Sequence, residues 1–241
     1  IDATESTLTP FEQRIHQTRP HMGQIFVASR MIEILSDSKI LQQHSECNRV
    51  QDPYSFRCIP QVHGPVQESF QKLIETVSIE LNSSTDNPLI FPTPENPGSH
   101  EVVSQGNFHA EVLALLADAM SLGLFELSSI SERRIDQMLD PARRAIRPFL
   151  AENPGLESGL MIVQYVAAAS LGELRGHANP RTAFSTTTSA GQEDHVSMGA
   201  TASWNLLEAI QRCREVLACE AFVAHRAIKL IDKPSSTCIE S

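Results

Sequence analysis

The sequence lacks the short motifs that mark several large enzyme classes. It contains no Gly-x-Ser-x-Gly nucleophile elbow, no His-Glu-x-x-His zinc helix and no phosphate-binding glycine loop. Their absence excludes serine hydrolases of the elbow type, zinc peptidases of the His-Glu-x-x-His type and P-loop enzymes. Any catalytic function must therefore come from a combination of weaker motifs.

Cysteine is scarce and irregularly spaced. No Cys-x-x-Cys pair occurs, so neither a zinc cluster nor a redox pair is indicated, and the odd number gives no complete disulfide framework. A reducing, cytoplasmic location is expected. The five cysteines are Cys47, Cys58, Cys213, Cys219 and Cys238.

Positive charge is also in short supply. The chain has 19 Lys and Arg residues against 29 Asp and Glu, a net charge of −10 at pH 7. Binding to nucleic acid or to an anionic membrane depends on a basic patch, so neither partner is expected. The longest uncharged run, residues 158–172, is shorter than the roughly 18 to 20 apolar residues of a membrane helix. Small-molecule and protein partners remain.

What is present is the composition of a globular protein, with 41% hydrophobic and 20% charged residues in a total of 241. A chain of this length buries enough surface to fold without disulfides or metal, as one large domain or two small ones. It opens with Ile1-Asp2-Ala3 rather than Met. We therefore expect it to be a piece of a longer protein.

The spacing of apolar residues predicts long helices. Between residues 65 and 82 they recur every three or four positions, which is typical of one helical face. In residues 110–127 they cover most of the circumference, so that helix is expected to be buried nearly all round. Residues 160–171 are similar, and residues 194–230, which contain no proline, are expected to form one long helix. The predicted fold class is all-α, a bundle of long helices.

Three polar stretches, residues 48–64, 82–107 and 175–192, separate these helices. The second holds four prolines and cannot be helical throughout. Connections of this length inside a compact domain are usually functional or disordered. Candidate site residues are therefore sought in these stretches.

The first stretch contains Tyr54 and Arg57. An arginine can make a forked, two-bond contact with a carboxylate, and a tyrosine can donate or accept a proton. The alternative for Arg57 is a surface arginine paired with an acid.

Plainer interpretations also exist for the other stretches. Residues 85–88, Thr-Asp-Asn-Pro, are a turn signal by themselves. His109 is more often a core or capping histidine than a ligand, and Glu193 is interpreted as a first-turn helix carboxylate. Adjacent residues on a helix point about 100° apart, so Glu193, Asp194 and His195 are not expected to converge on one metal ion, and no metal is predicted.

In combination, five segments resemble the aromatic amino-acid lyase family, most closely its histidine-specific members. They are Gln-Asp-Pro-Tyr-Ser-Phe-Arg-Cys-Ile-Pro-Gln-Val-His-Gly at 51–64, Thr-Asp-Asn-Pro-Leu at 85–89, Gly-Asn-Phe-His-Ala-Glu at 106–111, Ser-Glu-Arg-Arg-Ile at 131–135 and Gln-Glu-Asp-His-Val-Ser-Met at 192–198. Each segment is weakly specific, but their order and separations cover most of the chain.

The resemblance implies that residues 1–241 are the C-terminal helical portion of a homotetramer whose active sites are each assembled from loops of three subunits. Members of the family remove ammonia from an amino acid to leave an α,β-unsaturated acid. Their electrophile is a methylidene-imidazolone ring that forms autocatalytically from Ala-Ser-Gly. No Ala-Ser-Gly occurs here, because Ser189-Ala190-Gly191 has the wrong order. The tripeptide is therefore expected in an N-terminal half upstream.

The resemblance also implies roles for individual residues. Arg57 resembles the residue that binds the substrate carboxylate, and Tyr54 resembles an active-site tyrosine that takes part in proton transfer. Four residues resemble those that line the pocket and bind the substrate, namely Gln51, Asn87, Phe108 and Gln192.

Glu193 matches the position that pairs with the substrate imidazole in histidine-specific members. A carboxylate favours an imidazole, whereas against a phenyl ring it would be buried and unpaired, which costs a few kcal/mol. The implied reaction is therefore conversion of L-histidine to urocanate and ammonia.

Two alternatives stand beside this function. One is a tyrosine or phenylalanine lyase or an aminomutase of the same family. Departures at Gly191 and at residues 171–176 leave room for it, since histidine-specific members usually carry other residues there. The other is a non-catalytic helical assembly fragment. By itself the chain is expected to be inactive, because arginine, tyrosine and carboxylate supply orientation and proton transfer but no electron sink.

Overall fold

The computed structural model describes residues 1–43, 50–142, 147–231 and 234–240. Cys47 lies outside these residues. The predicted all-α fold class is confirmed, since long helices dominate and the described strands form a single hairpin.

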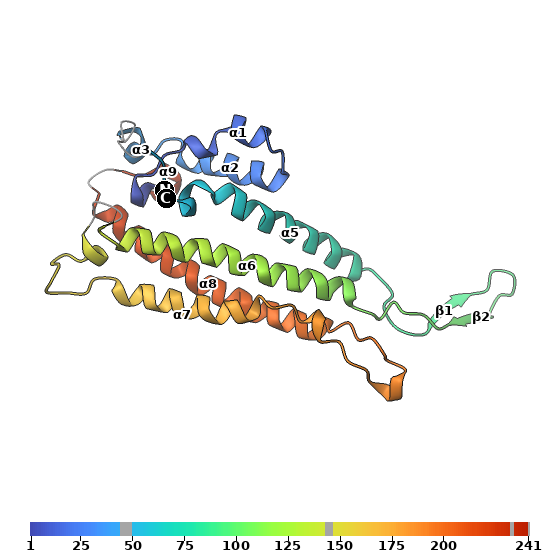
Figure 1. Ribbon diagram of the computed structural model, residues 1–241. Helices are drawn as coiled ribbons and strands as arrows, with labels where there is room; N and C mark the ends of the chain where they lie inside the picture. Colours follow the sequence, from blue (N-terminus) through green and yellow to red (C-terminus); the bar gives the residue numbers. More distant parts are fainter. Residues whose placement is uncertain (44–49, 143–146, 232–233, 241) are drawn as a thin grey trace.

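Four long helices run side by side and form an elongated bundle (Figure 1). They are α5 (Ile59–Glu80), α6 (Glu111–Leu139), α7 (Met161–His177) and α8 (Gly199–Lys229). Helix α6 lies at the centre and contacts α5, α7 and α8, while α2 (Met22–Leu35) packs against α5. The bundle is therefore organised around α6.

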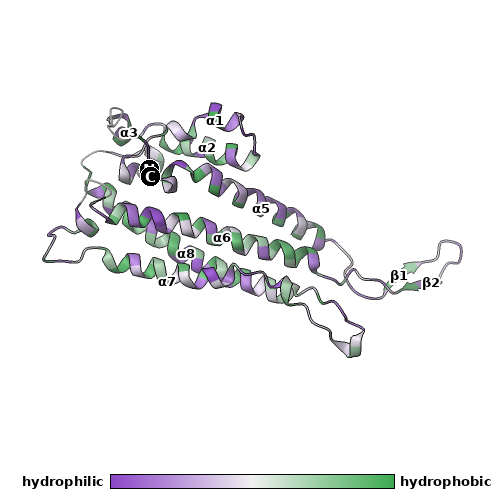
Figure 2. Cartoon of the chain, viewed as in Figure 1, coloured by the Kyte–Doolittle hydropathy of each residue, from purple (hydrophilic) through white to green (hydrophobic). Residues whose placement is uncertain are grey.

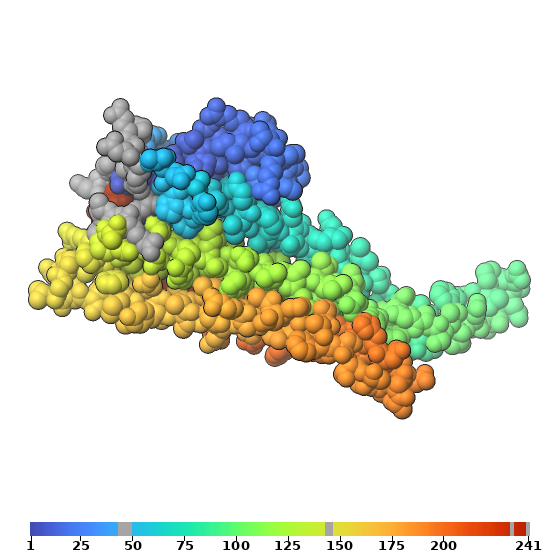
Figure 3. Space-filling view, viewed as in Figure 1, coloured from blue at the N-terminus to red at the C-terminus, as the bar shows by residue number. Residues whose placement is uncertain are grey.

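Shorter elements complete the chain. The antiparallel hairpin consists of β1 (Leu89–Pro92) and β2 (His100–Val103), with Leu89 paired with Val103. The hairpin and the segment 178–198 project from the same end of the molecule (Figure 3). The short helices and strands are α1 (Gln13–Gln17), α3 (Lys39–Gln43), α4 (Tyr54–Arg57), α9 (Thr237–Glu240), β1 (Leu89–Pro92) and β2 (His100–Val103), with 3-10 turns at Asp2–Thr4, Thr9–Phe11, Pro148–Leu150, Thr182–Phe184 and Ser189–Gly191.

Small side chains allow the helices to approach closely. Ala114 and Ala117 of α6 pack against Ala202 of α8, and all three are buried. Where α2 crosses α5, Gly23 faces Gly64, and a Cβ atom on either glycine would overlap the backbone of the other helix. These positions fix the crossing points, because any larger side chain would separate the backbones.

The expectation that residues 110–127 are buried all round is wrong for the single chain. Val112, Leu115 and Leu122 are about half exposed, because α5, α7 and α8 cover only part of the circumference of α6. Hydrophobic residues also occur along α7 (Figure 2), where Ile162 and Val166 are exposed. Helix α6 is long and apolar enough to cross a membrane. The core helix of a soluble protein can meet the same two criteria.

Two helix boundaries differ from the sequence prediction. Helix α8 begins at Gly199 rather than near residue 194, because the preceding Met198 adopts a left-handed conformation with φ 56°. Residues 48–64 are not one polar loop, since α4 and the first turns of α5 lie within them. Pro60 stands in the first turn of α5, where a missing N–H has no intrahelical partner to lose.

A largely buried ion pair joins α6 to α8. The Arg134 guanidinium donates two hydrogen bonds to the Glu220 carboxylate, one of them at 2.8 Å from Nη2, and a third at 3.3 Å to the carbonyl oxygen of Ser55 before the end of α4. Ser131 donates to Glu220 at 2.5 Å. Burial raises the pKa of Glu220, but the bonds and charge of Arg134 outweigh that effect, and the pKa lies below its ordinary value. The pair therefore remains ionised.

Replacing Arg134 by Met should lower the free energy of unfolding by about 3 kcal/mol, because Glu220 would remain buried without its partner. Urea unfolding of the two proteins measures the difference. Arg30→Met removes an exposed pair with Glu33 and should cost under about 1 kcal/mol. Equal losses in both variants would contradict the structural role given to Arg134.

His63 on α5 adds a pH dependence to this cluster. The pKa of His63 is lowered from 6.5 to about 4, first by burial and then by the charge of Arg134, while Glu220 opposes the shift. Its Nε2 is buried without a hydrogen-bond partner among the described residues. The folded protein therefore binds fewer protons at this ring than the unfolded chain between pH 6.5 and 4.

As the pH falls through that window, the free energy of unfolding should drop, by up to about 3 kcal/mol from His63. The His63→Gln variant should not show this acid-induced decrease in the free energy of unfolding. The His21→Gln variant, changed at an exposed histidine, should show it in full. Urea unfolding at pH 7 and pH 4.5 tests the difference. A His63→Gln variant as acid-sensitive as the natural protein would rule this explanation out.

Candidate active site

Gln51, Tyr54 and Arg57 lie together in and just before α4, and we call them the arginine group. The guanidinium carbon of Arg57 lies 4.6 Å from the centroid of the Tyr54 ring, a cation–π contact. Tyr54 is 70% exposed and Gln51 is exposed. The group thus presents a cation, a phenol and an amide at one surface.

The segment that carries the arginine group is held by buried neighbours. Asp52 accepts a hydrogen bond from the backbone N–H of Thr7 at 2.8 Å, and Phe56 is 2% exposed. The carbonyl of Ser55 accepts from Arg134. The short helix α4 is therefore fixed to the core although its outer side chains face solvent.

Arg57 retains capacity to bind an anion. Its Nε is buried and has no hydrogen-bond partner among the described residues, and no carboxylate in the described part of the chain forms an ion pair with it. The alternative of a surface arginine paired with an acid is therefore not what the described residues show. A substrate carboxylate could occupy the fork.

Asn87, Phe108, Gln192 and Glu193 lie at the other end of the bundle, and we call them the glutamate group. All four are exposed in the chain. The side-chain oxygen of Asn87 accepts hydrogen bonds from the backbone N–H of Gln105 at 3.0 Å and from the Ser104 hydroxyl at 3.4 Å. Asn87 therefore fixes the turn before β1. The expected turn at residues 85–88 is present.

Glu193 lies in a loop rather than in a helix. The expectation of a first-turn carboxylate is wrong, because α8 begins six residues later. Thr188 donates its hydroxyl to the Glu193 carboxylate and its backbone N–H to the Glu193 carbonyl at 2.9 Å. Hydrogen bonds from Thr188 and Ser189 hold the pKa of Glu193 below its ordinary value. The loop thus presents an exposed carboxylate anion.

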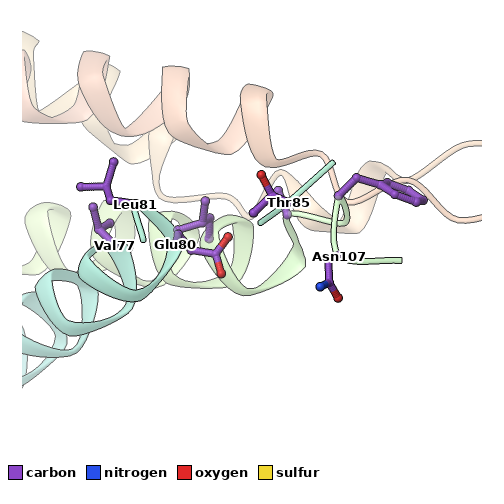
Figure 4. A pocket seen from close by; sticks show the side chains of 8 residues that line it. Val77, Glu80, Leu81, Thr85 and Asn107 are labelled. Atoms are coloured by element: carbon purple, nitrogen blue, oxygen red, sulfur yellow. The ribbon is translucent and has the colours of Figure 1, made fainter. Parts of the chain in front are cut away.

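Phe108 borders an open hollow of about 320 Å³ between the end of α5 and the start of α6. Most of its lining is apolar, with Glu80, Thr85 and Asn107 supplying polar atoms (Figure 4). Of the glutamate group, Phe108 alone belongs to the lining. The residues that line the hollow are Val77, Glu80, Leu81, Thr85, Asn107, Phe108, Ala110 and Leu113.

The two groups cannot meet within one chain. The arginine group lies beside Arg134, near the C-terminal end of α6, whereas Gly199 and His195 contact the residues just before its N-terminus at Glu111. Because an α-helix rises about 1.5 Å per residue, Glu111 and Arg134 lie about 35 Å apart along α6. The structure therefore brings Gln51, Tyr54 and Arg57 together, and separates them from the glutamate group.

Sequence reasoning missed a third feature. His109 and His195 stand 86 positions apart, yet their rings are nearly parallel with centroids 5.7 Å apart. With Glu111 they bring three potential metal-binding atoms within 4.8 Å of one another. Both histidines belong to segments that carry the family resemblance, but no spacing rule could pair them.

A family model described as aromatic amino acid lyase matches residues 1–240. The chain is similar to histidine ammonia-lyase of Koribacter versatilis (strain Ellin345), with 41% identity over 236 residues, 95% of this chain and 46% of the relative. It is 43% identical over 227 residues to histidine ammonia-lyase of Bacillus thuringiensis (strain Al Hakam), covering 94% of this chain and 44% of the relative. The chain spans about half the length of the curated relatives it matches.

Solved structures agree with these relatives. Histidine ammonia-lyase from Trypanosoma cruzi superposes with a TM-score of 0.88 at 36% identity, covering 99% of this chain and 44% of that chain. Phenylalanine aminomutase of Pantoea agglomerans gives 0.85 at 31% identity, covering 95% and 47%. The family model, these superpositions and the central helix α6 lead to one conclusion: the chain belongs to the aromatic amino acid lyase family.

Proposed function

We propose that the protein to which this chain belongs is a histidine ammonia-lyase, which converts L-histidine to urocanate and ammonia. The observation that carries this proposal is Glu193, an exposed carboxylate held ionised by Thr188 and Ser189. Such a group pairs well with an imidazole and poorly with a phenyl ring. The names of the relatives with 41% and 43% identity support the same substrate.

The arginine group would bind the amino-acid end of the substrate. Arg57 has a buried, unpartnered Nε and would take the substrate carboxylate in its fork. Tyr54, stacked on Arg57, would accept or return a proton at its phenolic oxygen. Gln51, before α4, would donate a hydrogen bond to the same end of the substrate.

The glutamate group would bind the imidazole end. Glu193 would accept a hydrogen bond from the ring, and Gln192 beside it would line the same wall. Phe108 would pack against the flat ring, and Asn87 would order the adjoining turn. These roles use only the side chains that the two groups expose.

The family's electrophile, a methylidene-imidazolone ring, would supply the electron sink that permits the amino group to leave. The residues present fit a site of that kind, because a guanidinium whose Nε has no hydrogen-bond partner and an exposed phenol stand together. No Ala-Ser-Gly occurs in this chain, so we propose that the ring forms in an N-terminal half outside this sequence. The 241 residues would then be the C-terminal helical portion, inactive by themselves.

We propose a homotetramer in which each active site combines groups from different subunits. The separation of about 35 Å between the two groups supports this, since one chain cannot bring both to one substrate. Exposed apolar side chains on the long helices support it too, because subunit contacts would bury them. They include Leu115, Leu122, Tyr165, Val166, Trp204, Leu207 and Phe222.

An aminomutase of the same family is a second candidate. The similarity to phenylalanine aminomutase, at 31% identity, favours it over a function outside the family. An aminomutase would return ammonia to the β carbon and yield a β-amino acid, so analysis of the product separates it from a lyase. A phenylalanine or tyrosine lyase is separated by its substrate.

We also propose a cytoplasmic location. Cys58, Cys213 and Cys219 are free thiols, and Cys213 is buried among apolar side chains. Free buried thiols suit a reducing compartment.

Changing Glu193 to Gln in the full-length protein should lower kcat/KM for histidine by about 10- to 100-fold, because a charge-assisted hydrogen bond becomes a neutral one. Turnover of phenylalanine or tyrosine, where measurable, should change much less. Steady-state kinetics on the three substrates provide the measurement, with Asp194→Asn, at the exposed neighbour, as the matched control. Equal losses on all substrates would remove the role given to Glu193.

The shared site can be tested by mixing two inactive variants. Arg57→Ala damages the arginine group and Glu193→Ala damages the glutamate group. If one active site takes the two groups from different subunits, some sites in a mixed oligomer contain both natural residues. Random co-assembly should restore about a quarter of the natural activity, whereas each variant alone stays inactive. A mixture that remains inactive although mass spectrometry shows mixed oligomers would contradict the shared site.

A further inference from the structure

Three metal-ligating side chains gather where the segment 178–198 meets the start of α6. They are His109, Glu111 and His195, and their candidate ligand atoms lie within 4.8 Å of one another. His109 and Glu111 are partly buried and His195 is exposed. None of the three belongs to the arginine group or the glutamate group.

A hydrogen bond fixes the free ring nitrogen of His109, whereas that of His195 depends on its tautomer. The Nε2 of His109 lies 3.1 Å from the backbone carbonyl oxygen of His195, an acceptor, so Nε2 carries the proton and Nδ1 keeps its lone pair. The Nδ1 of His195 lies 3.4 Å from the Ser185 hydroxyl, whose oxygen accepts the Val196 backbone N–H at 2.9 Å. When Nδ1 of His195 donates to that oxygen, its Nε2 is free.

This pattern is the usual one around a metal-bound histidine, in which the nitrogen away from the ion donates to a carbonyl or another oxygen. Here both rings have such a partner, and the partners come from the polypeptide itself. A histidine that only caps a helix needs neither a second imidazole ring nor a carboxylate beside it. The presence of both beside His109 therefore favours metal binding over a capping role.

The geometry suits an ion of the zinc type. Two imidazole nitrogens bound at about 2.0 to 2.1 Å place their ring centres about 5 to 6 Å apart, and the observed separation is 5.7 Å. The rings are stacked with 15° between their planes, so one ring must turn before both in-plane lone pairs point at one ion. Nitrogen and oxygen ligands of a tetrahedral ion lie about 3.4 Å apart, so the three groups must close by up to about 1.5 Å. The exposed side chain of His195 has the most freedom to make that adjustment by rotation.

Electrostatics require the carboxylate. A cation at the N-terminus of α6 would meet the positive end of the helix dipole. Glu111, the first residue of α6, offsets that charge and supplies the third ligand. Two neutral imidazoles and one carboxylate are a known donor set for Zn²⁺, with the fourth position left to water.

We propose that His109, Glu111 and His195 bind one divalent transition-metal ion of the zinc type, which fastens the segment 178–198 to the start of α6. The ion is structural. It orders the two stretches that carry Phe108 and Glu193 without touching either residue. The proposal does not depend on the substrate or on the reaction.

The test uses the full-length protein with any affinity tag removed, in a buffer without histidine or imidazole. Equilibrium dialysis against Zn²⁺ should give one ion per subunit, and Co²⁺ in its place should show the visible absorption of a tetrahedral site. His195→Ala and Glu111→Gln should each weaken binding at least tenfold, and the double variant His109→Ala/His195→Ala should abolish it. Ser185→Ala, which removes the partner of His195 and the acceptor of the Val196 backbone N–H, should weaken binding about tenfold.

His100→Ala, at an exposed histidine of β2, is the matched control and should bind as the natural protein does. Circular dichroism of each variant shows that it is folded, and His195→Gln provides a milder substitution if the alanine variant is not. Binding that persists in the double variant would overturn the proposal, as would the absence of stoichiometric binding by the natural protein. Both outcomes can be read whether or not the protein acts on histidine.

Discussion

The length of α6 is the constraint on which the rest of the structure depends. Its 29 residues form one continuous helix, and the candidate site residues are attached to opposite ends of it. A rigid helix cannot bring its ends together, so the arginine group and the glutamate group are held about 35 Å apart in every chain. The proposed oligomer follows from this separation and from the apolar surface of the helices.

The two ends of α6 are held differently. Near Leu139, which lies in a buried hydrophobic cluster with Val223, Arg134 joins Glu220 of α8 and the backbone of α4, so the arginine group is fixed to the core. Near Glu111 the alanines of α6 pack against α8, but the residues before the helix are held by exposed polar contacts between His109, His195 and their neighbours. A segment held by exposed polar contacts opens at lower free energy than one held by the core, which is why an ion there would matter.

Much of the fold could be predicted from the sequence, because apolar spacing reports which face of a helix is covered. The amphipathic pattern of residues 65–82 lies within α5, and the proline-free C-terminal stretch forms α8. The boundaries were less predictable, since a single backbone conformation at Met198 delays the start of α8. The full burial expected for residues 110–127 was wrong because periodicity shows how apolar a face is, and not which chain covers it.

By itself the sequence determined the helical class, the acidic charge and the five segments that identify the family, since these depend on composition and on local order along the chain. Only the tertiary structure decided which segments meet. It shows Arg57 over the Tyr54 ring with an Nε that has no hydrogen-bond partner, and Glu193 in a loop rather than in the expected helix. It also shows His109 beside His195. The physical reason differs between these contacts: His109 and His195 are 86 positions apart and meet only through tertiary packing, whereas the contacts of Arg57 with Tyr54 and of Glu193 with Thr188 depend on local backbone conformation that apolar spacing does not report.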